Sequence, residues 1–149
     1  MKVDGWQKKL EGFLWSREHS PFEWGTNDCC IFACDGVEVM TGIDPACWFR
    51  GKYHNRKQAF RSLREFSGGS VKEMADKIQR NFRWETIPND KREFGDLALI
   101  VIDNIDEEAS RLSNQVTLGI VCRQGYIATP SIEGLAFNHN PQIIRVARV

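Results

Sequence analysis

The residues best suited to chemistry lie in a turn that leads directly into an apolar helical pattern. This turn runs from Trp24 to Cys30 and places Cys29 at the predicted start of a helix, immediately after Asp28. Unpaired backbone amides at a helix start create a positive field, which favours a thiolate and lowers the pKa of a cysteine. Cys29 is therefore the candidate nucleophile, whereas Cys30 begins the apolar face of the helix.

A cysteine nucleophile needs a histidine that accepts and returns the thiol proton. It also needs amide donors that stabilise an oxyanion. The chain contains three histidines. His139 follows a predicted strand and is the candidate base, because a curled sheet would bring it over the helix start. His19 and His54 are expected to be exposed or packing residues. Asp28 is expected to cap the helix, a role that Asn27 could also fill.

Apolar periodicity predicts helices first and strands second. The predicted helices are 3–18, 29–41, 56–66 and 71–82. Runs rich in Val, Ile and Leu then predict strands at 84–87, 96–102, 116–122, 126–129, 135–138 and 143–149. Short links such as 123–125 favour antiparallel hairpins. This order predicts an α+β fold in one domain, 1–149, with N-terminal helices packed on a small C-terminal antiparallel sheet.

Composition narrows the classes of partner and cofactor. Twenty basic and twenty acidic residues give a formal net charge of zero, so nucleic acid is not the expected partner. No apolar run approaches the roughly 20 residues that a membrane span needs. The first residues do not resemble a secretory signal, so we expect synthesis in the cytoplasm. Five cysteines without paired C-x2-C spacing predict reduced thiols, no metal site and no cofactor.

The charges and the tryptophans leave alternatives open. Basic residues gather without a carboxylate between 50 and 64, and acidic residues gather at Asp103, Asp106, Glu107 and Glu108. These blocks are either solvated faces or an oriented docking surface; Lys57, Arg61 and Arg64 share one helix face. The five tryptophans either form a sugar-stacking groove or pack in the core and at interfaces.

Three short motifs carry a resemblance to a known family. They are Trp24-Gly25-x-x-Asp28-Cys29 before a core helix, Phe94-Gly95-Asp96-Leu97-Ala98-Leu99 at the start of a strand, and Leu118-Gly119-Ile120-Val121 on the next strand. Together they resemble the NlpC-type cell-wall cysteine peptidases of the papain-like superfamily. The whole chain is similar to a small family encoded in bacteriophage and prophage tail regions, which also has Gly51-Lys52-Tyr53 and Gly134-Leu135-Ala136-Phe137 in this order.

The resemblance implies a papain-like, NlpC-type fold with Cys29 as the nucleophile. It also implies that this chain differs from the peptidases at the position of their catalytic histidine. The peptidases carry His-Val-Gly-Ile on the strand after the Gly-Asp motif, whereas this chain has Thr117-Leu118-Gly119-Ile120. Thr117 therefore occupies the histidine position, and the pKa of its hydroxyl is far too high for proton exchange at neutral pH. The expected active site is degenerate unless His139 replaces the missing base.

Two functions follow as expectations from the resemblance. The first is a structural or assembly component of a phage tail hub or tip, made in the host cytoplasm and carried in the virion. Its expected partners are tail hub, tip or tape-measure proteins. The alternative is an active cysteine peptidase or amidase that uses Cys29 to cleave peptidoglycan during genome delivery.

Overall fold

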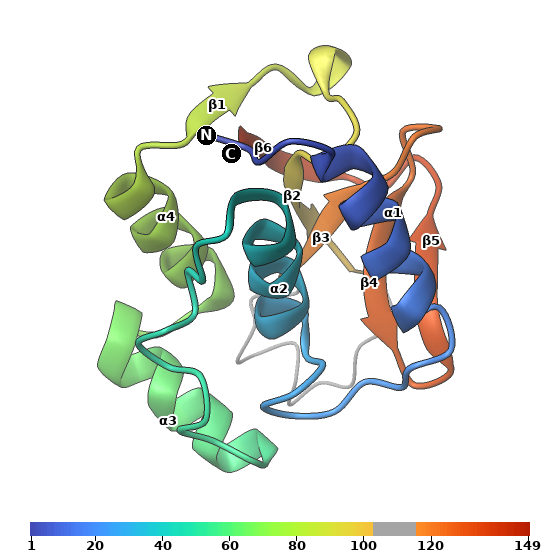
Figure 1. The fold of residues 1–149 in the computed structure, drawn as a ribbon. Coiled ribbons are helices and arrows are strands. Elements are labelled where there is room, and N and C mark those ends of the chain that lie inside the picture. Colours follow the sequence, from blue (N-terminus) through green and yellow to red (C-terminus); the bar gives the residue numbers. More distant parts are fainter. Residues whose placement is uncertain (103–115) are drawn as a thin grey trace.

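The computed structural model describes residues 1–102 and 116–149 (Figure 1). Within these ranges four helices come first: α1 (Trp6–Arg17), α2 (Cys29–Thr41), α3 (Arg56–Ser67) and α4 (Val71–Phe82). The strands are β1 (Glu85–Ile87), β2 (Leu97–Val101), β3 (Val116–Val121), β4 (Ile127–Ser131), β5 (Gly134–Asn138) and β6 (Ile143–Arg148). The α+β class predicted from the sequence is confirmed.

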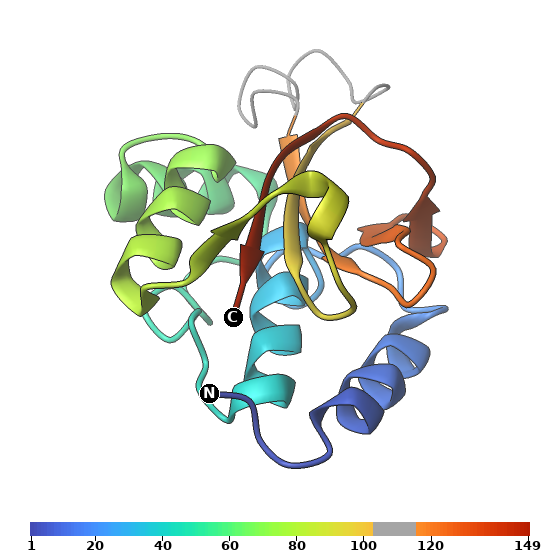
Figure 2. The same cartoon turned by 90° about the horizontal axis from the view of Figure 1, so that it is seen from above.

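The described strands form one antiparallel sheet in the order β1-β6-β2-β3-β4-β5. The link 123–125 joins β3 and β4 as an antiparallel pair, as its length predicted. Figures 1 and 2 show α2 packed against the sheet. Helix α1 lies on one side of α2, and α3 and α4 lie on the other side of α2. The predicted arrangement of N-terminal helices packed on a C-terminal sheet is thus present.

Helix α2 is the core helix because nearly all of its sides are covered. Ile31, Phe32 and Met40 are fully buried, and Phe32 stacks on Phe13 of α1 with ring centroids 5.5 Å apart. Toward the sheet, α2 packs on β3, where Ile120 is also fully buried. A helix that is apolar on most sides is stable only when it is buried in this way.

The second face of the sheet carries a smaller apolar cluster. Ala98, Ile100, Val121 and Ile127 are fully buried there, with Ile143 packed against them. These residues alternate along β2 and β3 with those that face α2, as the two-residue period of a strand requires. The sheet is therefore apolar on both faces near its centre.

Of the two charged blocks in the sequence, the structure describes only the basic one. Lys57, Arg61 and Arg64 are exposed on α3, as a solvated or docking face requires. Asp103, Asp106, Glu107 and Glu108 lie outside the described residues.

We predict that Gly119→Ala destabilises the domain while Gly12→Ala does not. A Cβ at Gly119 on β3 would lie 2.7 Å from the Ala128 carbonyl oxygen, which belongs to the neighbouring strand and cannot move away cheaply. Gly12 lies on α1 with open space around it, so alanine there is expected to add about 0.5–1 kcal/mol. We expect Gly119→Ala to lose about 2 kcal/mol or more. Urea denaturation measures both, and equal stabilities would contradict the close approach of β3 and β4.

Candidate active site

The carboxylate of Asp28 determines where α2 begins. One oxygen, Oδ1, accepts hydrogen bonds from the amides of Cys30 at 3.1 Å and Ile31 at 3.0 Å. This is the N-cap geometry predicted for Asp28, with an extended backbone before the helix. The cap places Cys29 as the first residue of the helix, so its thiol lies in the positive field of the helix start.

The second oxygen of Asp28 binds the loops in front of the helix. Oδ2 accepts a hydrogen bond from the Tyr53 hydroxyl at 2.6 Å and one from the Gly25 amide at 2.9 Å. Gly25 has a φ of 86° and approaches the Tyr53 carbonyl so closely that a Cβ would collide with it. Burial and the neighbouring Asp28 raise the pKa of Tyr53, which therefore stays a hydroxyl donor. Asp28 is thus a structural acceptor.

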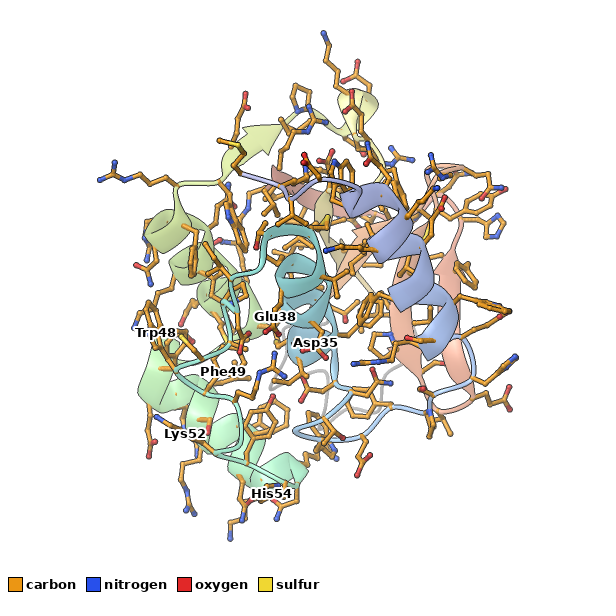
Figure 3. The ribbon with its side chains drawn as sticks, viewed as in Figure 1. Asp35, Glu38, Trp48, Phe49, Lys52 and His54 are labelled. Carbon is orange, nitrogen blue, oxygen red and sulfur yellow. The ribbon has the colours of Figure 1, made fainter. Side chains whose placement is uncertain are left out.

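An ion-pair network holds the segment between α2 and α3. Asp35 of α2 pairs with Arg17 at 2.8 Å and with Arg50 at 2.6 Å, and Arg50 also binds Asp44 at 2.7 Å. The Arg50 guanidinium holds the pKa of Asp44 below its usual range. Figure 3 shows Asp35 and Glu38 on α2 and the segment that carries Trp48, Phe49, Lys52 and His54. This network ties the end of α1, the middle of α2 and the Tyr53 segment together.

Three neighbours of the Cys29 thiol lower its pKa: Cys30, Thr117 and the backbone of Leu118. The largest effect comes from Cys30, whose sulfur lies 3.8 Å from that of Cys29. Thr117 and the Leu118 backbone act in the same direction, and together these neighbours lower the pKa of Cys29 despite burial and the nearby Asp28 charge. The contact with Cys29 and burial raise the pKa of Cys30 well above the ordinary value, and either sulfur can be the donor in this contact.

Cys29 lies in a groove with a volume of about 830 Å³. Its walls come from the start of α2, from α3, from the Tyr53 segment and from β3, β4 and β5. Most of the lining is apolar and includes Phe22, Trp24, Phe49, Tyr53, Phe60 and Leu63. The polar side chains around Cys29 and along the strands include Thr117, Thr129, Ser131, Asn138 and Arg56. The arrangement joins a thiol to an apolar binding surface.

The structure brings Thr117 to Cys29 and does not bring His139 there. His139 is exposed and stacks on Tyr126, with ring centroids 3.9 Å apart. The preceding Asn138 pairs with Ile127, which pairs with Val121 at the far end of β3. Val121 is four residues beyond Thr117, and four residues of strand span about 13 Å. A ring there is out of hydrogen-bond reach of Cys29.

The two other histidines also lie away from the thiol. The His19 side chain is 90% exposed beside Glu18, and His54 is exposed just before α3, in agreement with the sequence expectation. All three histidines fall within the described ranges, and none of them lines the groove. The described residues therefore place a thiol of lowered pKa in the groove, with no imidazole beside it.

The tryptophans do not gather into one sugar-binding surface. Trp24 lines the groove and makes an edge contact with Phe60. Three others stack or tilt against single phenylalanines: Trp6 on Phe94, Trp48 on Phe66 and Trp84 on Phe82. Trp15 is 79% exposed on α1. Packing thus accounts for most of the tryptophans.

Sequence reasoning missed the hydrogen bond from Tyr53 to Asp28 and the contribution of α3 to the groove. Tyr53 was noticed only as part of a motif, and its position two residues before the Asn55 cap of α3 gave no sign of its partner. The apolar face of α3, with Ala59, Phe60 and Leu63 buried, was a detectable signal. Periodicity shows that a helix has a buried face but not which element covers it.

Within the described residues no cluster of three or more metal-ligating side chains occurs, and the five cysteines are free thiols. None of the described helices has the length and apolar character that crossing a bilayer requires.

A protein family described as "Domain of unknown function (DUF6950)" matches residues 1–149. The chain belongs to this family. No curated protein matches the chain. The description of the DUF6950 family assigns no activity.

We predict that Tyr53→Phe lowers the free energy of unfolding of this DUF6950 domain by about 1–3 kcal/mol, because it leaves a buried Asp28 oxygen with one donor fewer. Tyr126→Phe is the matched control: it removes the same group from a half-exposed ring for which the described residues show no hydroxyl partner. We expect the control to change stability by less than about 0.5 kcal/mol. Chemical denaturation compares the two variants, and equal losses would argue against the Asp28 acceptor role.

We also predict that Thr117→Val slows alkylation of Cys29 by iodoacetamide about two- to tenfold at pH 7. Loss of the Thr117 hydroxyl removes one of the neighbours that lower the Cys29 pKa, and an interaction of about 0.5–1.5 kcal/mol corresponds to up to about one pKa unit. Thr129→Val is the control, because the Thr129 hydroxyl accepts from Asn138 instead. Peptide mapping by mass spectrometry follows Cys29 alone. Equal rates in the two variants would show that Thr117 does not stabilise the thiolate.

Proposed function

We propose that this protein is a structural or assembly component of a phage tail hub or tip, with a papain-like, NlpC-type fold whose active site is degenerate. One observation carries the proposal: Thr117 and no histidine lies beside Cys29 in the groove. The resemblance puts Thr117 where the peptidases have histidine. The placement in a tail is supported by the order of motifs that the chain shares with the tail-region family.

The chemistry of amide hydrolysis explains why this change matters. The amine that leaves must receive a proton, and in a cysteine peptidase the histidine supplies it. Thr117 cannot do so, and Asp28 is engaged by four amide and hydroxyl donors. Loss of a catalytic base alone reduces rates by orders of magnitude. The fold is thereby left with a binding groove but without peptidase chemistry.

The exposed basic face of α3 supports a docking role. Within the described residues no carboxylate forms an ion pair with Lys57, Arg61 or Arg64. Unneutralised charges of one sign on one helix face favour an acidic partner surface and steer its approach. Tail hub, tip or tape-measure proteins with acidic patches are the proposed partners.

We predict that the triple change Lys57→Glu, Arg61→Glu and Arg64→Glu reduces incorporation into phage particles at least tenfold without unfolding the domain. The matched control is Lys8→Glu, Lys9→Glu and Lys91→Glu, which changes the net charge equally at exposed positions elsewhere. Immunoblots of purified particles measure incorporation, and circular dichroism checks the fold. Equal incorporation of the two triple variants would remove α3 as the docking face. Absence of the unaltered protein from particles would contradict the tail role.

A second candidate, an active peptidoglycan peptidase or amidase, is favoured by the lowered pKa of Cys29 beside an open groove. Mass spectrometry of fragments released from purified sacculi separates the two functions. A structural role predicts no release above that of Cys29→Ala. Release that depends on Cys29 would establish the hydrolase and overturn the degenerate site.

A further inference from the structure

The groove beside Cys29 is much larger than the thiol and its donors require. Its volume of about 830 Å³ falls in the range of about 300–1,000 Å³ that is typical of small-molecule sites. Aromatic side chains such as Trp24, Phe49 and Phe60 form its walls, together with aliphatic ones such as Leu63 and Met74. A lining of this kind binds an apolar group and gains free energy from the area that it removes from water.

Polar groups lie at two places in the groove: along β4 and β5, with Thr129, Ser131 and Asn138, and at the start of α2. Cys29 and Thr117 lie there, and Thr117 is only 6% exposed. In the first turn of α2, the amides of Cys30 and Ile31 donate to the Asp28 carboxylate and that of Phe32 donates to the Asp28 carbonyl. Among the described residues the amide of Cys29 has no acceptor. It is the donor left to bind a ligand oxygen next to the thiol.

The absence of an imidazole from the groove limits which acyl groups the thiol can accept. An amide releases an amine, which needs a proton donor, so amides are poor substrates here. A thioester releases a thiolate, which is as good a leaving group as Cys29 itself and needs no general acid. Exchange between two thiols is therefore the acyl chemistry that remains accessible to this site.

We propose that Cys29 accepts an aliphatic acyl group from an acyl thioester and that the apolar groove holds the acyl chain. The Cys29 sulfur attacks the thioester carbonyl carbon, and a new carbon–sulfur bond forms as the bond to the donor sulfur breaks. The donor leaves as a thiolate and takes up from solvent the proton that the Cys29 thiol released. The product is an S-acylated protein and a free thiol, with no change of oxidation state.

The apolar groove makes Cys29 selective for acyl donors with a longer aliphatic chain. Each buried methylene is worth about 0.8 kcal/mol, so about two buried methylenes account for a tenfold preference. An octanoyl donor should therefore react with Cys29 at least tenfold faster than an acetyl donor at equal, low concentration. This inference rests on the groove and not on the tail role. Acylation of Cys29 and incorporation into phage particles are therefore tested independently of each other.

The test uses the full chain with S-octanoyl- and S-acetyl-N-acetylcysteamine, two donors that differ only in chain length. Intact-mass spectrometry follows the gain of one acyl group, and hydroxylamine should remove it. Cys29→Ala should abolish this acylation, whereas Cys47→Ala should retain it, because Cys47 is exposed and does not line the groove. Persistence of the acylation in Cys29→Ala would overturn the proposal.

A variant that narrows the groove distinguishes chain binding from mere thiol reactivity. Ala136 on β5 lines the groove and is half-buried, so Ala136→Phe fills space in the groove and leaves Cys29 and Thr117 unaltered. We expect octanoyl transfer to fall at least tenfold and acetyl transfer to stay within twofold. Equal rates for the two donors in the unaltered protein, or no acylation of Cys29 in a protein that circular dichroism shows to be folded, would overturn the proposal.

Discussion

The carboxylate of Asp28 is the constraint on which the rest of the site depends. It is 3% exposed and accepts four hydrogen bonds, two from the first turn of α2 and two from the loops that carry Gly25 and Tyr53. A buried carboxylate without such donors would cost several kcal/mol, so the helix start and both loops have to be in place together. The position of the Cys29 thiol follows from this assembly.

Cysteine peptidases combine two properties: they stabilise a thiolate, and they transfer a proton to the leaving group. The lowered pKa of Cys29 has causes next to the thiol: the contact with Cys30, and Thr117 and the Leu118 backbone on β3. Proton transfer to a leaving group needs a titratable partner, and the strand that would carry it presents Thr117. In the function proposed here, the sulfur has a lowered pKa but no imidazole beside it, which favours binding or thioester exchange over amide hydrolysis.

Much of the fold was predictable because local signals agree. Asp28 and Gly42 delimit α2 at its two ends, and the short 123–125 link determines the β3–β4 pairing. The position of His139 was not predictable, because it depends on how far β5 lies from β3 and on which ring it stacks. The Tyr53–Asp28 hydrogen bond joins residues 25 positions apart, and no sequence period reports such a contact.

The pH dependence of Cys29 alkylation in the unaltered protein and in His139→Ala tests the central claim most directly. If Cys30, Thr117 and Leu118 lower the pKa of the thiol without a histidine, the rate follows one titration, at a pH below that of a free cysteine, and His139→Ala leaves the profile unchanged. A second titration near the pKa of an imidazole, lost in His139→Ala, would show that a histidine does reach Cys29 and would contradict a degenerate site.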